Sequence, residues 1–269
     1  MEFGLFTCGY QRRKLEQAFS DASAFGYDYI ELWGGRPHAY APDLVRGDWD
    51  LLRALSEEYC VPVRVYTPEH NAYPFNYMIG DAAQWADSIQ YLKTAIHASA
   101  LIGAEAMLVS IGHSGGMNSA QRRERLRASL QELAEEAQKR GQILLLENLT
   151  PMESDGYTSL SEYSTLFSGD LPGITAMCDV VVPFVQGENP VDYVRALGDN
   201  LGHIHLTDSN GVDESHLLPG DGVMDLKKLL WDLRSTGYDG NVTIELVTNY
   251  MKDPTGAAAL AIRRIKELI

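Results

Sequence analysis

The chain has 269 residues, enough for one barrel of about 250 residues or for two smaller domains. Its net charge of −15 argues against nucleic acid as a partner, because phosphate binding needs clustered Lys and Arg. Its hydrophobic content of 45% is ordinary for a globular protein, and no apolar run approaches the ~20 residues of a membrane span, so we expect no membrane partner.

Short apolar runs alternate along the chain with longer amphipathic segments, as in parallel strands joined by helices. In chain order, each expected strand and its helix cover residues 3–7 and 12–25, 27–32 and 49–59, 61–66 and 81–101, 106–110 and 120–140, 143–146 and 160–167, 173–177 and 190–197, 203–206 and 226–236, 242–246 and 254–268. Eight such pairs predict an α/β fold, a (β/α)₈ TIM barrel. No Pro/Gly/Ser-rich linker divides the chain, so we expect a single domain over residues 1–269.

A doubly wound open sheet would use the same alternation of strands and helices. It would usually carry a GxGxxG motif or a phosphate loop after the first strand. Residues 7–10 read TCGY and match neither motif. The barrel is therefore favoured.

The beginning of the chain and its cysteines bear on its location. Residues 1–15 show no basic segment followed by an apolar stretch, so we expect no signal peptide. Cys8, Cys60 and Cys178 lie far apart without a CxxC spacing, which favours reduced thiols over disulfides. We therefore expect a cytoplasmic protein.

Four metal-ligand residue types stand at the ends of the last four expected strands: Glu147, Asp179, His205 and Glu245. Strand alternation puts Glu147 on one face with Leu145, so a barrel would send it inward at the C-terminal mouth. Carboxylates and an imidazole without a thiolate suit one divalent ion, Mn²⁺, Co²⁺, Ni²⁺, Mg²⁺ or Zn²⁺. For Asp179 alone, a helix cap is an open alternative.

Other polar residues have more than one reading. His113 lies in a Gly-rich loop, where substrate contact and plain loop polarity are both open. We expect His216 near the site, Glu31 to contact substrate or to pair with Arg36, and His203 to be a core histidine.

Two long loops, 33–48 and 67–80, would border the mouth of the barrel, and they are rich in aromatic residues: Trp33, Tyr73, Phe75 and Tyr77. These rings are suited to covering a substrate and excluding water. A hydrophobic cap or a subunit contact explains them equally well.

The strand-end set resembles the xylose isomerase-like family of sugar isomerases, ketose 3-epimerases and AP endonucleases. The stretches 203–208 (HIHLTD) and 216–222 (HLLPGDG) resemble the family's seventh-strand signature. Within the family the resemblance points to ketose 3-epimerases, on the stretches 6–9 (FTCG), 30–38 (IELWGGRPH), 66–69 (YTPE), 185–186 (VQ) and 244–248 (IELVT). It runs over nearly the whole chain.

The resemblance implies metal-dependent epimerisation at C3 of a ketose or ketosamine, with fructoselysine converted to psicoselysine as the best expectation. The metal would chelate the C2 and C3 oxygens and stabilise a cis-enediolate, with Glu147 and Glu245 as acid and base on opposite faces. Glu153 matches a substrate-contacting Glu of those enzymes, and we expect substrate contacts from Trp33, Glu69, His113 and His216 as well. Relatives of this kind also imply a homo-oligomer.

The sequence departs from the family pattern at two positions. Many ketose 3-epimerases have a His and an Arg where this chain has Val182 and Gly211, so other groups must hold the substrate's C2 oxygen. Rival hypotheses are a hydroxypyruvate- or inosose-type isomerase, a metal-dependent phosphodiesterase or AP endonuclease, and a non-catalytic sugar-binding barrel. The acidic net charge disfavours the metal-dependent phosphodiesterase or AP endonuclease. Val182 disfavours it too, because it stands where an AP endonuclease would need a His ligand.

Overall fold

Eight parallel strands close into a barrel in the order β1 to β8 in the computed structural model of the chain. The structure describes residues 1–70, 74–169 and 172–269. The strands are β1 (Glu2–Phe6), β2 (Tyr29–Gly34), β3 (Val63–Pro68), β4 (Ala106–Ser110), β5 (Ile143–Glu147), β6 (Ile174–Asp179), β7 (Leu201–Leu206) and β8 (Asn241–Ile244). The predicted (β/α)₈ TIM barrel is confirmed.

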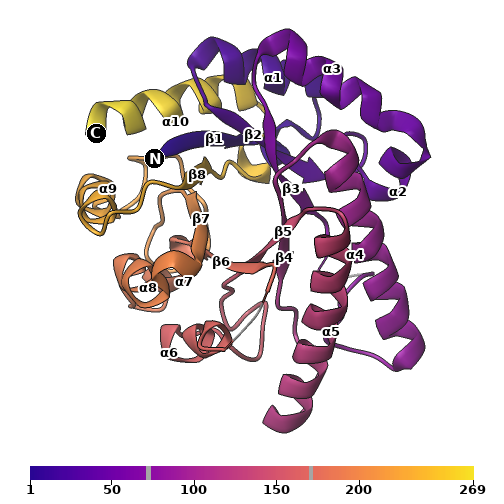
Figure 1. Cartoon of the computed structure of the whole chain (residues 1–269). Helices are drawn as coiled ribbons and strands as arrows, with labels where there is room; N and C mark the ends of the chain where they lie inside the picture. Colours follow the sequence, from indigo (N-terminus) through magenta and orange to yellow (C-terminus); the bar gives the residue numbers. More distant parts are fainter. Residues whose placement is uncertain (71–73, 170–171) are drawn as a thin grey trace.

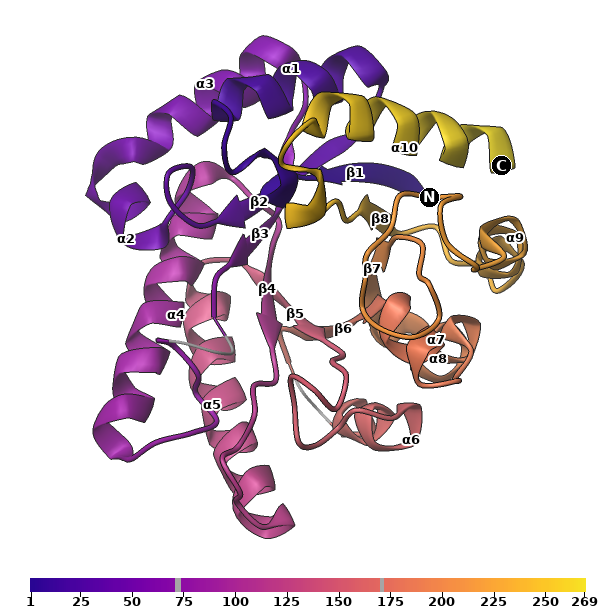
Figure 2. The ribbon, with the colours of Figure 1, turned by 180° about the vertical axis from the view of Figure 1, so that it is seen from behind.

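The helices lie around the outside of the barrel, and the two chain ends lie side by side in both views (Figures 1 and 2). The α-helices are α1 (Leu15–Phe25), α2 (Ala41–Asp43), α3 (Trp49–Tyr59), α4 (Ala82–Ile102), α5 (Ser119–Lys139), α6 (Leu160–Tyr163), α7 (Val181–Val185), α8 (Pro190–Leu197), α9 (Leu226–Ser235) and α10 (Pro254–Leu268). The short 3₁₀ helices are η1 (Thr7–Tyr10), η3 (Ser164–Phe167), η4 (Gly198–Asn200) and η5 (Thr248–Tyr250), and η2 (Leu44–Asp48) is a π-helical turn. Over the described ranges, no helix is long and apolar enough to cross a membrane.

Capping residues explain where the two longest helices begin. Asp81 before α4 and Asn118 before α5 each accept two backbone N–H groups of the first turn, and a Gln side chain three residues on completes a capping box. These side chains satisfy donors that a helix start leaves free.

Several element ends differ from the prediction. Thr7 begins the turn η1 instead of ending a strand, and the helix predicted over 160–167 is the short α6 followed by η3. β8 ends at Ile244, two residues before the predicted end at 246, because its partner strand β7 ends at Leu206, which pairs with Ile244. Glu245 is therefore the first residue beyond its strand.

Strand alternation separates two apolar cores. Outward residues such as Leu144 and Leu146 of β5 pack with the helices in the larger core. Inward residues form a separate cluster inside the barrel: Val65, Ala106, Leu108, Leu145 and Met177. Because Glu147 follows Leu145 by two residues, it shares the inward face one layer nearer the mouth.

Strands β3 and β7 each contain a β-bulge. Beyond the bulge, the side chains that point into the barrel are those of the opposite parity. Opposite its partner, β3 has one additional residue, Arg64, and β7 has one, Gly202. Val63 belongs to the outer core, whereas Val65, just past the bulge, lies in the inner cluster. A bulge re-aims the side chains that follow it, and the bulge at Gly202 turns the end of β7, including His205, inward.

Candidate functional site

The four strand-end residues lie on neighbouring strands at the C-terminal mouth of the barrel. Glu147 is the last residue of β5, Asp179 the last of β6, and Glu245 the first after β8. On β7, His205 pairs in register with Asp179 on one side and with Thr243, two residues before Glu245, on the other. All four positions therefore lie at or within two residues of the carboxyl ends of adjacent strands, at the same mouth.

His205 and Glu245 are the centre of this group. His205 Nδ1 lies 3.1 Å from Glu245 Oε2 and 3.9 Å from Glu147 Oε1. His216 Nε2 lies 3.2 Å from the same Glu245 oxygen and 3.3 Å from Asp179 Oδ2. The structure thus brings all four predicted ligands together and places His216 beside them.

The pKa values of Glu147 and Glu245 are shifted in opposite directions. Burial raises the pKa of Glu147 to about 8. Burial would also raise the pKa of Glu245, but His216 and His205 outweigh it and hold that pKa well below its ordinary value. Burial would lower the pKa values of both histidines. Glu31 and Glu245 instead hold that of His205 well above its ordinary value, and Glu245 and Asp179 do the same for His216. Protons therefore lie between the carboxylate and imidazole atoms of this group that would bind a metal ion. A divalent cation could take the place of these protons.

The chemistry of the donors fits a hard or borderline divalent ion. Three carboxylates and one or two imidazoles supply oxygen and nitrogen atoms. Cys8 is close enough for Glu245 and His216 to influence it, but burial raises the pKa of its thiol to about 12. It therefore stays a thiol and is a poor ligand.

Behind this group, Glu31 of β2 is completely buried. It accepts hydrogen bonds from His205 Nε2 at 2.8 Å, from His203 Nε2 at 2.9 Å and from the Thr67 hydroxyl at 2.7 Å. The alternative that Glu31 pairs with Arg36 was wrong, because Arg36 pairs with Asp43 of α2 instead. Substrate contact by Glu31 stays a prediction. His203 is a buried core histidine, as expected.

An apolar wall adjoins the site on the β1 and β8 side. Phe6, Cys8 and Trp33 form a small cluster with Val247, and the Phe6 ring lies 5.9 Å from that of His205. The Trp33 indole N–H donates to Glu69, whose side chain reaches solvent. Two of the predicted substrate contacts, Trp33 and Glu69, therefore form one unit beside the site.

Glu153 and His113 differ in how close they come to the site. Burial raises the pKa of Glu153 to about 7, with further repulsion from Glu214, Asp179 and Glu245, although its side chain keeps contact with solvent. His113 instead accepts a hydrogen bond from Gly115 N–H and lies 3.8 Å from Asp155, contacts that belong to its own loop region.

Two other rim aromatics, Phe75 and Tyr77, pack away from the site. Phe75 stacks on Tyr91 of α4 with ring centroids 3.9 Å apart, and the buried Tyr77 donates to the Ser110 carbonyl. Both are therefore packing residues. Tyr73 lies outside the described residues.

At positions 182 and 211, where the sequence departs from the family pattern, the chain has no polar side chain. Val182 is buried in α7, and Gly211 has a left-handed backbone, with φ of 78°, in the loop after β7. His216, five residues after Gly211, reaches the site instead. One residue that sequence reasoning missed is Ser110, which donates to Glu147 Oε2 at 2.6 Å. Its signal was its place as the last residue of β4.

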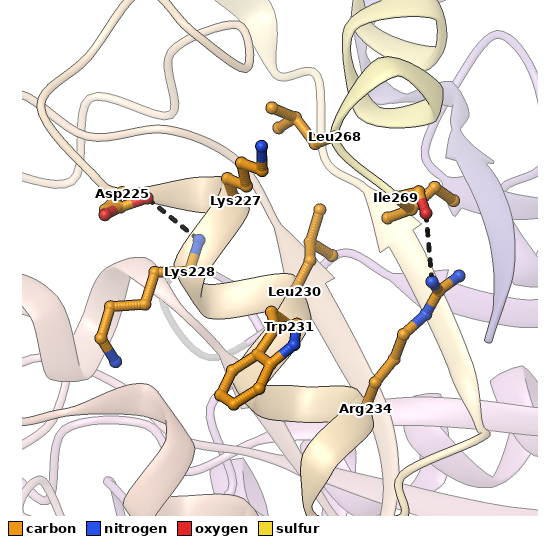
Figure 3. A pocket seen from close by; sticks show the side chains of 8 residues that line it. All are labelled: Asp225, Lys227, Lys228, Leu230, Trp231, Arg234, Leu268 and Ile269. Carbon is orange, nitrogen blue, oxygen red and sulfur yellow. Dashed lines mark hydrogen bonds between the residues drawn. The ribbon is translucent and has the colours of Figure 1, made fainter.

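A hollow on the outer surface lies away from this site. It has a volume of about 340 Å³ between α9 and the end of α10, and its lining includes Trp231, Arg234 and Ile269 (Figure 3). It contains none of the strand-end residues, so it is separate from the mouth of the barrel.

Comparisons with known proteins agree with this architecture. Residues 19–268 match the family model described as xylose isomerase-like TIM barrel. The curated "Fructoselysine 3-epimerase" proteins of Shigella flexneri and Escherichia coli O157:H7 are each 41% identical, over 100% of this chain and 98% of their own length. The solved D-allulose 3-epimerase of Methylomonas sp. in complex with D-allulose is 22% identical with a TM-score of 0.82, over 100% of this chain and 97% of that one.

Full-length relatives at this identity are epimerases, so the chain is an enzyme of the isomerase class. Both the match to the family model and the closed eight-stranded barrel lead to the same assignment. The chain belongs to the xylose isomerase-like TIM barrel family.

Proposed function

We propose that this enzyme epimerises C3 of a ketosamine, converting fructoselysine to psicoselysine, in a site that holds one divalent metal ion. The supporting observation is that both glutamates lie beside His205 Nδ1, Glu147 at 3.9 Å and Glu245 at 3.1 Å. These carboxylates come from β5 and β8, which are separated by two strands of the barrel. A 3-epimerase needs one group to remove the C3 proton and another to return a proton on the opposite face.

The donor set supports metal dependence. Glu147, Asp179, His205 and Glu245 would hold the ion, and its chemistry would be to polarise the C2 carbonyl and thereby acidify the C3 proton. Ser110 would keep the Glu147 carboxylate in one orientation through its hydrogen bond. His216 is the group that the structure offers in place of the polar residues absent at 182 and 211.

The surroundings of the site support a substrate with an aliphatic, amine-bearing arm. Phe6, Trp33 and Val247 would pack against methylene groups, and Glu69 beside them would accept a hydrogen bond from an ammonium group. Relatives that are 41% identical over the full chain carry the name fructoselysine 3-epimerase. The ketosamine is therefore favoured over a simple ketose.

Isotope exchange tests this proposal. Metal-loaded protein is incubated with fructoselysine in D₂O, and the sugar is followed by NMR. We expect deuterium at C3 of both epimers and none at C1, where a 1,2-isomerase would exchange. Glu147→Gln and Glu245→Gln should each lower the C3 exchange rate by about 100-fold or more, since general acid–base catalysis contributes that much.

Glu135→Gln, on the exposed face of α5, is the matched control and should leave the exchange rate unchanged. Absence of deuterium at C3 would exclude this substrate. Wild-type exchange in either active-site variant would exclude the two-glutamate mechanism.

A further inference from the structure

We propose that Glu31 is the positioning residue of the metal site, holding His205 so that Nε2 carries the proton and Nδ1 faces the mouth as the ligand atom. This inference rests on the proposed function, because it concerns the same metal site. It assigns a role to a buried carboxylate that touches none of the other three predicted ligands.

The hydrogen bonds of Glu31 fix both of its oxygens. Oε1 accepts from His205 Nε2 at 2.8 Å and from Thr67 Oγ1 at 2.7 Å, and Oε2 is 2.9 Å from His203 Nε2. The Glu31 and His203 side chains are 0% exposed and that of His205 is 1% exposed, so no solvent competes for these bonds. A carboxylate can only accept, so each histidine must donate from Nε2.

The opposite nitrogen of His205 is thereby left free of a proton whenever the ring is neutral. That nitrogen, Nδ1, is the one that lies between Glu147 and Glu245. A neutral imidazole binds a metal through its unprotonated nitrogen, and a carboxylate on the other nitrogen fixes the tautomer and makes the ligand more basic. Glu31 therefore selects the nitrogen that faces the site.

Glu31, His203 and His205 could instead hold a second metal ion, because their ligand atoms lie within 4.8 Å of one another. The Glu31 oxygens are already 2.8 Å and 2.9 Å from the two Nε2 atoms, which is direct hydrogen-bond contact. His205 Nε2 would have to lose its proton and its hydrogen bond to become a ligand there. The geometry favours a supporting network.

The backbone builds this network through the two bulges. The additional residue Arg64 turns the following part of β3 inward, so that Thr67 reaches Glu31. The additional residue Gly202 does the same for the two histidines of β7. A Cβ on Gly202 would lie 2.7 Å from the Thr175 side chain, so this bulge is built around a glycine.

Metal titration of the folded protein without sugar tests the proposal. Zn²⁺ affinity is measured by calorimetry after removal of bound metal, for wild type, Glu31→Gln and Glu31→Ala. We expect the affinity to fall about 10-fold in the first variant and about 100-fold in the second, the range seen when such supporting groups are lost. Asp21→Asn is the matched control, since it removes another buried carboxylate, which accepts from Tyr10 and Thr255 away from the site, and its Zn²⁺ affinity should be unchanged.

The ring tautomer gives a readout that a purely structural role would not move. In ¹⁵N NMR of the Zn²⁺-loaded wild type, His205 should carry its proton on Nε2 and bind through Nδ1. A proton on Nδ1, or Zn²⁺ affinities of both Glu31 variants within twofold of wild type, would overturn the proposal. The wild-type spectrum decides the question even if a variant fails to fold, and neither measurement depends on which sugar the enzyme uses.

Discussion

Glu147 and Glu245 are identical side chains at the same mouth, but their surroundings act on them differently. Burial raises the pKa of Glu147 to about 8, and among the described residues its hydrogen-bond donor is the neutral hydroxyl of Ser110. Glu245 is beside two histidines that hold its pKa well below the ordinary value in spite of burial. Carboxylates whose pKa values are separated in this way can carry acid and base roles at one pH.

The raised pKa of Glu147 predicts a pH-dependent stability of the metal-free protein. The folded state binds this proton more tightly than the unfolded state, whose pKa is near 4.5. The corresponding stabilisation is therefore complete below pH ~4.5 and is lost as pH rises through ~8. In metal-free protein, Glu147→Gln should raise Tm relative to wild type by roughly 2–8 °C at pH 9 and have little effect at pH 5.

Thermal unfolding in the presence of EDTA measures this difference. Glu135→Gln on the exposed face of α5 is the control and should change Tm equally little at both pH values. A Tm difference between Glu147→Gln and wild type that does not change with pH would contradict the assignment.

At the scale of elements, the loop after β7 is folded by one carboxylate. Buried Asp208 accepts from four backbone N–H groups, at distances of 2.8–3.0 Å, those of Ser209, Gly220, Gly222 and Met224. Asp208 also pairs with Leu217 through the backbone in both directions. These bonds close the loop on itself and present His216, with a φ of 40°, to Asp179 and Glu245.

Asp208→Ala should release this loop. Charged hydrogen bonds contribute about 1.5–3 kcal/mol each when buried partners are left unsatisfied, so we expect a lower Tm and much faster hydrogen exchange at residues 220, 222 and 224. The kcat/KM should fall at least as far as in His216→Ala, because the histidine loses its position. Unchanged amide exchange at these three positions would show that the loop holds its shape without Asp208.

At the scale of the whole molecule, closure between β1 and β8 encloses an apolar layer beneath the polar mouth. This layer supports the site from below, and Leu145 lies in it, two residues before Glu147 on the same face. Removing its side chain would leave a cavity between strands whose positions are fixed by hydrogen bonds, so little collapse is possible.

Leu145→Ala should therefore lower the free energy of unfolding by about 2–5 kcal/mol, measured by urea denaturation. Leu51→Ala makes the same change at a side chain that is 62% exposed, and should cost no more than about 0.5 kcal/mol. Equal effects of the two substitutions would mean that the inner layer is not a packed core.

Much of the architecture follows from the sequence because its signals are local. Apolar periodicity predicted eight strand–helix pairs, and most ends fell within a few residues of the structure. The end of β8 at Ile244 depends on where the partner strand β7 stops, which local periodicity does not encode. Glu147, Asp179 and Glu245 were visible because each polar side chain ends an apolar strand.

The sequence by itself therefore determined the barrel, the family resemblance and the four residues that meet at its mouth, since each stands at the carboxyl end of a strand and parallel strand order brings those ends together. Only the tertiary structure decided how they are held. The bulges at Arg64 and Gly202 are set by pairing with neighbouring strands, and they reverse the alternation that a sequence reading assumes. Glu31 meets His203 across 172 residues of chain, and His216 reaches the site through a folded loop, so both contacts exist only once the barrel has closed.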